Sequence, residues 1–475
     1  MIFSSITFLL FFLPLFLIIY YLTGRRYKNI IILASSIFFY SWGAPKFIFI
    51  LLGSTYLDFY LVRWMDKMEG SNQRSILLSL SIILNVGLLA FFKYANFFVD
   101  NLNFFLESMG SNSFSWTKVI LPIGISFYTF QTLTYSIDIY RKEHKPLDRV
   151  LDYMLYIIMF PQLIAGPIVR FNQIADQIIE RIESLDDRIH GFCRFSIGLG
   201  KKVLIANVMG SKADEIMSME NFAQLDSLTA WLGILAYTFQ IYFDFSGYSD
   251  MAIGLGRMMG FKFPENFNNP YISKSISEFW RRWHITLGNW MRDYLYIPLG
   301  GNKVRSSRRL YFNLWFVFLI SGLWHGASWN FIIWGIYHGF FLVIERLFLK
   351  SILKRIGSWC SLAYCFFITV LGWVIFRIED IDLAWQYYGR LFAFDLEQHL
   401  SISFGGRFWT IGVIAIFFSF FTLIPYFKRI HNAIFEEKHD LSKQIILWII
   451  SIIIFTMCIG SLSTKGFNPF IYFRF

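Results

Sequence analysis

Long apolar stretches separated by short polar segments make up most of the chain. A helix that crosses the hydrocarbon core of a bilayer needs about 20 mostly apolar residues. Runs near that length cover residues 2–22, 76–92, 119–140, 228–245, 331–349, 359–376, 408–427 and 446–462. The pattern predicts an all-α protein that crosses a membrane several times.

Other apolar runs are shorter or interrupted, and they cover residues 30–42, 47–62, 151–165, 190–209 and 310–324. Gly43-Ala44-Pro45-Lys46 separates the first two, and Pro161 lies inside the third. Backbone that is not helical is tolerated at membrane depth only where protein or a water-filled cavity covers it. We therefore expect roughly ten to twelve membrane elements, some of them broken or re-entrant, around an internal cavity. They would form one membrane domain over residues 1–475.

Composition supports the membrane interpretation and excludes other classes. Of 475 residues, 56% are hydrophobic and only 16% are charged, whereas soluble domains are near a quarter charged. A water-soluble enzyme and a nucleic-acid-binding protein are therefore excluded. The net charge of +11 falls in short loops, where basic residues mark the cytoplasmic side. Arg25, Arg26 and Lys28 follow the first apolar run and place the N-terminus outside the cytoplasm. That run has no basic residue before it, unlike a cleavable signal peptide.

Residues 257–309 form the longest segment without a full apolar run, and basic residues outnumber acidic residues ten to three. The excess predicts a cytoplasmic location. Within it, the spacing of apolar residues over 277–295 predicts one amphipathic helix. Arg281, Arg282 and Arg292 lie on its polar face and are candidates for binding an acyl donor. Two interpretations stay open: attraction to anionic membrane lipid, or a mouth that attracts a phosphate-bearing donor.

Three histidines lie in apolar surroundings. His325, in Gly322-Leu323-Trp324-His325-Gly326-Ala327, ends one apolar run and precedes another, and ionisable residues at membrane depth are functional by default. His284 falls on the apolar face of the expected helix, either as a buried structural imidazole or facing a reaction chamber. His338 is a weaker third candidate. The remaining histidines lie in or beside polar loops, where surface roles are expected: His144, His190, His399, His431 and His439.

The cysteines and the known nucleotide motifs point to no further chemistry. The four cysteines lie in apolar runs without C-x-x-C spacing: Cys193, Cys360, Cys365 and Cys458. Buried structural thiols are expected rather than a metal site or a redox pair. No Walker motif, dinucleotide-binding glycine motif or H-E-x-x-H motif is present. We therefore expect no metal and no permanently bound cofactor.

A neutral imidazole in a partly dry cavity is suited to general-base catalysis of acyl transfer. Desolvation disfavours the charged form of histidine, so the ring can accept the proton of a hydroxyl that attacks an acyl carbonyl. The thiolate of a thioester donor leaves readily, so one base and one oxyanion donor would suffice for the transfer. The candidate oxyanion donors are His284, Asn289, Ser328 and Asn330, and the residues alone do not rank them.

The motifs around these histidines resemble the membrane-bound O-acyltransferase (MBOAT) superfamily. The stretches that carry the resemblance are residues 278–287 (EFWRRWHITL), 292–302 (RDYLYIPLGGN), 322–327 (GLWHGA), 160–168 (FPQLIAGPI) and 468–473 (NPFIYF). The likeness extends over essentially the whole chain and is strongest to the bacterial branch that O-acetylates alginate and peptidoglycan.

The resemblance implies a helical membrane fold with a central tunnel, His325 as the catalytic histidine and His284 as an assisting residue. It also implies acetyl-CoA or a related thioester as donor on the cytoplasmic side of the cell (inner) membrane. In this branch the acetyl group passes to an extracytoplasmic partner of the SGNH-hydrolase type, which esterifies a cell-surface polysaccharide.

Two alternatives remain at this stage. The first is D-alanyl transfer to teichoic acid from a carrier-protein thioester, because the D-alanyl-transferring subunit shares the Trp-His motif. The second, from another class, is a transporter for a lipid-linked or small anionic solute, since broken helices and midplane polar groups also occur in transporters.

Overall fold

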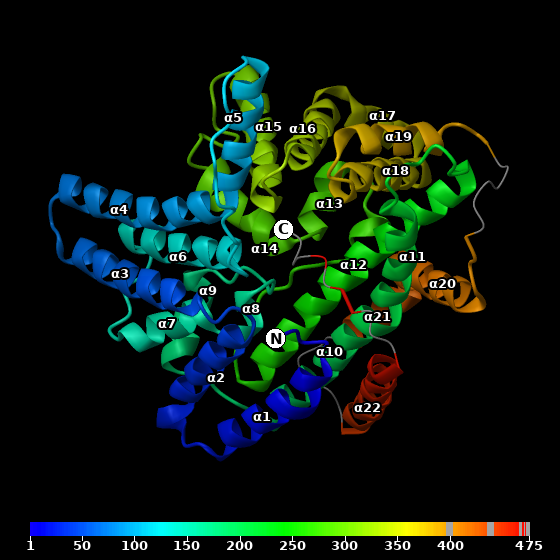
Figure 1. The fold of residues 1–475 in the computed structure, drawn as a ribbon. Helices are drawn as coiled ribbons and strands as arrows, with labels where there is room; N and C mark the ends of the chain where they lie inside the picture. The colour runs from blue at the N-terminus through cyan, green and yellow to red at the C-terminus, as the bar shows by residue number, and fades with distance from the viewer. Residues whose placement is uncertain (396–401, 435–440, 465–467, 470, 472–475) are drawn as a thin grey trace. The chain divides into compact units, whose positions relative to one another are not determined.

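The computed structural model describes residues 1–395, 402–434, 441–464, 468–469 and 471, and this part of the chain contains helices and no strand (Figure 1). It divides into two compact units: Met1–Arg188 with Leu255–Pro264, and Ile189–Gly254 with Glu265–Phe475. The all-α prediction is confirmed for the described residues. The expectation of one domain over 1–475 stays a prediction.

The first unit is built from the N-terminal helices and short 3-10 or π segments (η). In chain order these are η1 (Phe8–Phe12), α1 (Leu13–Leu22), η2 (Arg25–Tyr27), α2 (Lys28–Gly43), α3 (Ile48–Lys67), α4 (Ser71–Leu89), η3 (Ala90–Tyr94), α5 (Ala95–Ser108), α6 (Ile125–Tyr140), α7 (Val150–Ile158), α8 (Phe160–Leu163) and α9 (Phe171–Ile179). The predicted interruptions are confirmed: α2 and α3 are separate, and the helix before Pro161 ends at Ile158.

One helix of this unit starts later than the apolar pattern predicted. The run over 119–140 becomes helical only at Ile125, because Pro122 and Gly124 precede it and Gly124 has φ 79°. A Cβ at Gly124 would lie 2.6 Å from the carbonyl oxygen of Leu163, so only glycine fits both the left-handed backbone and the close approach.

A buried carboxylate joins four helices of the first unit. Asp58 on α3 accepts hydrogen bonds from Ser81 (2.5 Å) and Asn85 (2.9 Å) on α4, from Tyr153 (2.5 Å) on α7 and from Ser136 (3.5 Å) on α6. A buried polar group must be satisfied by such partners, so this network fixes how the four helices pack.

The second unit holds the remaining helices, except that the first residues of α10 and the last residues of α12 belong to the first unit. In chain order the elements are α10 (Leu185–Gly200), η4 (Lys201–Ala206), α11 (Asn207–Met217), α12 (Ser227–Met258), η5 (Pro270–Ile272), α13 (Ile276–Arg282), α14 (Ile285–Trp290), η6 (Met291–Tyr296), α15 (Ser307–His325), α16 (Trp329–Ile344), η7 (Glu345–Leu349), α17 (Lys350–Ile356), α18 (Ser358–Arg377), α19 (Ile381–Leu391), α20 (Gly406–Phe420), η8 (Phe421–Leu423), α21 (Pro425–Ile434) and α22 (Leu441–Thr464).

The hairpin of α15 and α16 is packed backbone to backbone (Figure 1). A Cβ at Gly322 would lie 2.2 Å from the carbonyl oxygen of Phe331, and one at Gly335 would lie 2.5 Å from that of Phe318. Small residues at such positions allow helices in membranes to approach closely. The hairpin therefore places the end of α15, where His325 lies, firmly against α16.

Six helices in the described residues are long and apolar enough to cross a membrane: Ile48–Lys67, Ser71–Ser108, Trp329–Ile356, Ser358–Arg377, Gly406–Leu423 and Ser442–Thr464. The second has 38 residues, about 57 Å at 1.5 Å per residue, far more than the hydrocarbon core. It changes direction at the π segment η3, between α4 and α5 (Figure 1), as π-bulges commonly allow. The expected total of membrane elements stays a prediction.

Candidate active site

His284 lies at a break between two short helices, so the prediction of one amphipathic helix over 277–295 is wrong. α13 ends at Arg282, His284 has a left-handed backbone (φ 46°, ψ 52°), and α14 begins at Ile285. The backbone N–H of Ile285 donates to the Asn266 carbonyl (2.9 Å), and the Arg282 carbonyl accepts from the N–H of Asn268 (2.9 Å). These bonds to a neighbouring segment replace the helical bonds that would have continued through the break.

The His284 ring is held by one amide. Asn266 donates through Nδ2 to the Ser249 hydroxyl (2.9 Å), and its Oδ1 accepts from the Thr286 hydroxyl (2.8 Å). The same oxygen lies 3.0 Å from His284 Nδ1. Because an amide oxygen only accepts, Nδ1 carries the proton and Nε2 carries the lone pair. Burial lowers the pKa of His284 to about 3, so the ring is neutral at cellular pH.

His325 is the last residue of α15 and is enclosed by aromatic rings. The residue is 4% exposed. The centroid of its ring lies 5.0 Å from that of Trp324, 5.1 Å from that of Trp334 and 5.2 Å from that of Phe376. A Cβ at Gly326 would lie 2.1 Å from the Phe331 ring. The Trp-His-Gly sequence therefore requires glycine at position 326, because the Phe331 ring occupies the space that a side chain there would need.

Trp324 brings the two predicted site histidines together. Its indole lies 5.9 Å from the ring of His284 and 5.0 Å from the ring of His325, centroid to centroid. Both distances fall in the usual range of aromatic contacts. The candidate site therefore joins the break after α13 to the end of α15.

His338 belongs to the same aromatic cluster on its other side. The residue is fully buried on α16, and its ring lies 4.9 Å from Trp334 and 4.9 Å from Trp280. Trp334 also contacts His325, so one indole separates the two histidines. A direct proton transfer between His325 and His338 is not favoured by this arrangement.

Glu345 is a buried residue of the site that the sequence interpretation missed. Its carboxylate accepts hydrogen bonds from the backbone N–H of Ile276 (2.5 Å) and from the N–H and hydroxyl of Ser277 (3.0 and 2.9 Å). It therefore caps the N-terminus of α13, where a negative charge is stabilised. The sequence did carry a signal for Glu345, because it lies inside the apolar run 331–349 and acidic residues within membrane-spanning segments are rare. Asn266 offered no comparable signal.

Two of the three candidate donor-binding arginines already have acidic partners. Arg282 pairs with Glu278 at 2.9 Å, and Arg292 pairs with Asp293 at 2.6 Å. Arg281 is exposed and has no ion-pair partner among the described residues. Arg281 is therefore the most available of the three for an incoming phosphate.

The candidate oxyanion donors are also distinguished by the structure. Asn330 is fully buried, and its amide nitrogen already donates to the Ile375 carbonyl (3.1 Å). Asn289 and Ser328 are half-buried. In its present conformation Asn330 is therefore the least suited of these three to donate to a substrate.

Several minor expectations need correction. His190 is buried within α10 rather than on a polar surface, because the helix starts five residues before it. Cys360 is exposed in the first turn of α18, whereas the other three cysteines are buried as predicted. His399 and His439 lie outside the described residues, and so do residues 470, 472 and 473 of the closing motif.

The described part of that motif is anchored by a buried ion pair. Lys202 and Asp244 pair at 2.7 Å with almost no exposure. Lys202 also donates to the Pro469 carbonyl, and the N–H of Ile471 donates to Asp244 (2.9 Å). Pro469 and Ile471 line a small pocket together with Phe376, whose ring contacts His325. The end of the chain is thus tied to the surroundings of the site.

Comparison with known proteins identifies the family of this chain. The sequence profile of the MBOAT, membrane-bound O-acyltransferase family, matches residues 77–378. The chain is 45% identical over 401 residues to a Pseudomonas aeruginosa protein named Probable alginate O-acetylase AlgI, covering 84% of this chain and 76% of that protein. It is 36% identical over 422 residues to the peptidoglycan O-acetyltransferase of Helicobacter pylori, covering 81% and 78%.

A more distant relative acts with a different acyl group. The chain is 33% identical over 248 residues to the teichoic acid D-alanyltransferase of Bacillus subtilis, covering 49% of this chain and 61% of that protein. The extent of the match to the family and to the acetylating relatives is decisive. This chain belongs to the membrane-bound O-acyltransferase family and is an O-acyltransferase.

Proposed function

We propose that this protein moves an acetyl group from a cytoplasmic thioester, acetyl-CoA or a related donor, across the cell membrane for O-acetylation of a cell-surface polysaccharide. The observation that carries the proposal is that the rings of His325 and His284 both contact the indole of Trp324. The acetylating relatives cover more than three quarters of the chain and support acetyl as the acyl group and a glycan such as alginate or peptidoglycan as the final acceptor.

In the proposed reaction His325 is the general base. Its ring nitrogen accepts the proton of the acceptor hydroxyl while the hydroxyl oxygen forms a bond to the acyl carbon. The carbon–sulfur bond breaks, and the departing thiolate takes up the proton from His325, which restores the neutral ring. The acyl ester and the free thiol are the products, so no external oxidant or reductant is needed.

His284 assists in this scheme as a neutral ring. The Asn266 amide fixes the proton on Nδ1, and burial keeps the ring uncharged. Since Nε2 then presents a lone pair, the ring favours a role in orienting a hydroxyl rather than in donating to an oxyanion. Because the single proton of the acceptor hydroxyl goes to His325, His284 would accept a hydrogen bond from a different hydroxyl of the acceptor and so orient it.

The donor side and the partner follow from the same proposal. Arg281 is exposed and has no ion pair in the described part of the chain, so it is our candidate for contacting a donor phosphate. We further propose an extracytoplasmic SGNH-type partner that receives the acetyl group, an N-terminus outside the cytoplasm and a tunnel that links the two faces.

The test is thioester turnover by the purified full chain in detergent, with radiolabelled acetyl-CoA and a soluble hydroxyl acceptor. We expect His325→Ala to lower turnover by about 10²- to 10⁴-fold, the usual effect of removing a general base. His431→Ala, a change to a half-buried histidine on α21, is the matched control and should keep wild-type turnover. Normal turnover in folded His325→Ala protein would refute the role.

The D-alanyl alternative rests on the relative that matches about half of the chain. The same assay separates the two donors when D-alanyl carrier protein replaces acetyl-CoA. Turnover with acetyl-CoA and none with the carrier protein supports acetylation, and the reverse result supports D-alanyl transfer. Solute uptake into vesicles that survives in His325→Ala would instead favour a transporter.

A further inference from the structure

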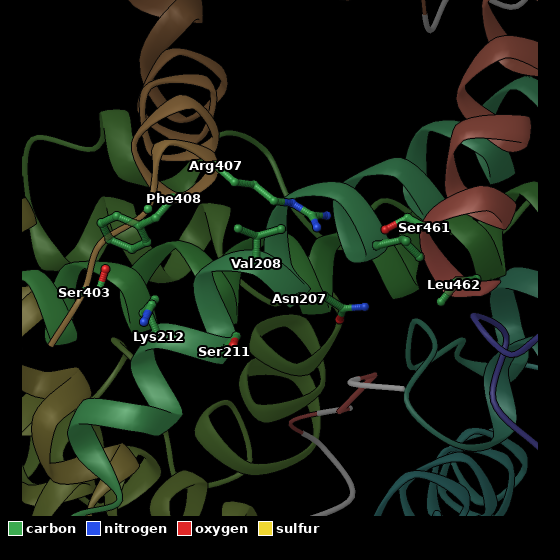
Figure 2. A pocket seen from close by; sticks show the side chains of 11 residues that line it. Asn207, Val208, Ser211, Lys212, Ser403, Arg407, Phe408, Ser461 and Leu462 are labelled. Atoms are coloured by element: carbon green, nitrogen blue, oxygen red, sulfur yellow. The ribbon is translucent and has the colours of Figure 1, made fainter. Parts of the chain in front are cut away.

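A second pocket in the same unit lies away from the histidines, between α11, α20 and α22. Its volume is about 410 Å³. Side chains from η4 and α11, from the start of α20 and from the end of α22 line it (Figure 2). None of them contacts His284 or His325 among the ring contacts and hydrogen bonds described above, so the acyl-transfer proposal leaves this pocket without a role.

The charge of the pocket is positive. Lys212 and Arg407 line it, and no aspartate or glutamate from the described ranges does. Lys212 shares its charge with Glu215 at 2.5 Å, whereas Arg407 is exposed and has no ion-pair partner in the described ranges. Figure 2 shows Arg407 reaching from α20 toward the middle of the pocket. An arginine with free N–H groups is well suited to a phosphate.

A buried acceptor also lies at the pocket. Asn207 is 8% exposed and donates through Nδ2 to Asn468 (3.2 Å), while its Oδ1 has no hydrogen-bond partner among the residues that the structure describes. A buried polar atom without a partner is uncommon. A hydroxyl group of a ligand would satisfy it, and the hydroxyls of Ser211, Ser403 and Ser461 also line the pocket.

The rest of the lining is apolar, and two of the helices that supply it carry exposed apolar residues. Val203, Val208, Phe408 and Leu462 complete the wall. α20 and α22 are both candidate membrane spans with little of their surface buried, and outward residues such as Val413 and Ile453 are exposed. If both helices cross the bilayer, the start of α20 and the end of α22 lie at the same membrane face. The pocket then sits at the level of lipid phosphates.

We propose that this pocket binds an anionic phospholipid with a hydroxylated head group. Arg407, assisted by Lys212, contacts the phosphate, and Asn207 Oδ1 accepts a hydrogen bond from a head-group hydroxyl. The acyl chains lie along the apolar wall and the exposed faces of α20 and α22. A free phosphate would satisfy the cations and leave the apolar wall uncovered, so a lipid fits the lining better.

The test is a titration of the full chain in neutral detergent with phosphatidylglycerol, and bound lipid is counted by native mass spectrometry. We expect phosphatidylglycerol to bind at least about tenfold more tightly than phosphatidylcholine. Arg407→Gln should weaken phosphatidylglycerol binding about tenfold or more, the usual loss for a hydrogen bond to a charged group. Lys212→Gln should weaken it in the same direction.

Arg429→Gln is the matched control, because Arg429 is an exposed arginine on α21 that does not line the pocket. Equal weakening by Arg429→Gln and Arg407→Gln would overturn the proposal in favour of general attraction between charges. Equal binding of both lipids would overturn it as well. Glycerol 1-phosphate that displaces the lipid at equal concentration would show a phosphate site instead. Unchanged unfolding temperatures of the lipid-free variants confirm that folding is intact.

Discussion

The two site histidines are held in opposite ways. His284 interrupts a helical segment in a left-handed backbone, and a side-chain amide that is itself hydrogen-bonded on both sides fixes its ring. His325 ends a regular helix, and three aromatic rings pack around it. Hydrogen bonding fixes the protonation of a ring, whereas packing fixes only its place. The Asn266 amide therefore sets the tautomer of His284, whereas the surrounding rings set the place of the His325 ring.

The largest expected effect comes from charging the partner of His284. Asn266→Asp places a carboxylate against Nδ1 and favours the imidazolium, because an opposite charge raises the pKa of a histidine. We expect turnover to fall about 10- to 100-fold at neutral pH and to recover partly as the pH rises and the ring loses its proton. The measurement is turnover against pH for both proteins. Asn221→Asp, at an exposed asparagine of the same unit, is the control. A flat profile in Asn266→Asp would contradict a neutral His284.

The hydrogen bonds of Glu345 at the N-terminus of α13 provide the next test of how His284 is held. Glu345→Gln replaces a carboxylate that accepts from two backbone N–H groups with an amide that has one oxygen, so one donor loses its partner. We expect a loss of about 1–3 kcal/mol in the free energy of unfolding and a fall in turnover through the misplaced His284. Thermal unfolding and turnover are measured together.

Glu220→Gln, at an exposed acid of the same unit, provides the control for the loss of charge. A variant that keeps both stability and turnover would show that the cap does not position the histidine.

Trp324 is the element shared by the two histidines, and its replacement should affect both modestly. Trp324→Phe keeps an aromatic ring and shortens its reach, so the contacts lose about 0.5–1.5 kcal/mol. The matching fall in turnover is about two- to tenfold. Trp409→Phe, an exposed tryptophan on α20, should change neither turnover nor stability. No effect of Trp324→Phe would indicate that the two histidines act independently.

The last expected effect concerns stability alone and is a pH dependence that belongs to His284. Its pKa is about 3 in the folded protein against about 6.5 when unfolded, so the unfolded state binds more protons between these values. The contribution of the neutral ring is therefore full above pH 6.5 and declines as the pH falls toward 3. The difference in unfolding temperature between wild type and His284→Asn should shrink from pH 7 to pH 4. The same difference at every pH would contradict the buried neutral ring.

How far the sequence predicts this molecule depends on where each interaction partner lies. Helices from long apolar runs were predictable because burial and local hydrogen bonds decide them. The interruption near Pro161 was also predictable, since proline is tolerated in the first turn of a helix but not in its interior, and Pro161 lies in the first turn of α8. The position of His325 at the end of a helix was predictable because an ionisable residue followed by glycine ends an apolar run, and its catalytic role stays a prediction.

The break at His284 was not predictable from its own segment. The spacing over 277–295 suits a continuous helix, and what ends α13 is the backbone of Asn266 and Asn268 in a different segment. The role of Asn266 depends on the same pairing, so no local pattern could reveal it. Glu345 lies between these cases: its depth indicated importance, but its contacts with Ile276 and Ser277 are tertiary.

The glycine contact between α15 and α16 has a consequence for how the protein assembles. Gly322 and Gly335 are only thirteen residues apart, and contacts between near neighbours in sequence form fastest. We expect this hairpin to dock early during synthesis, with His325 already seated at its end. His284 depends on a loop that must close against Asn266 and then meet Trp324. The two histidines therefore meet only when both segments have closed on Trp324.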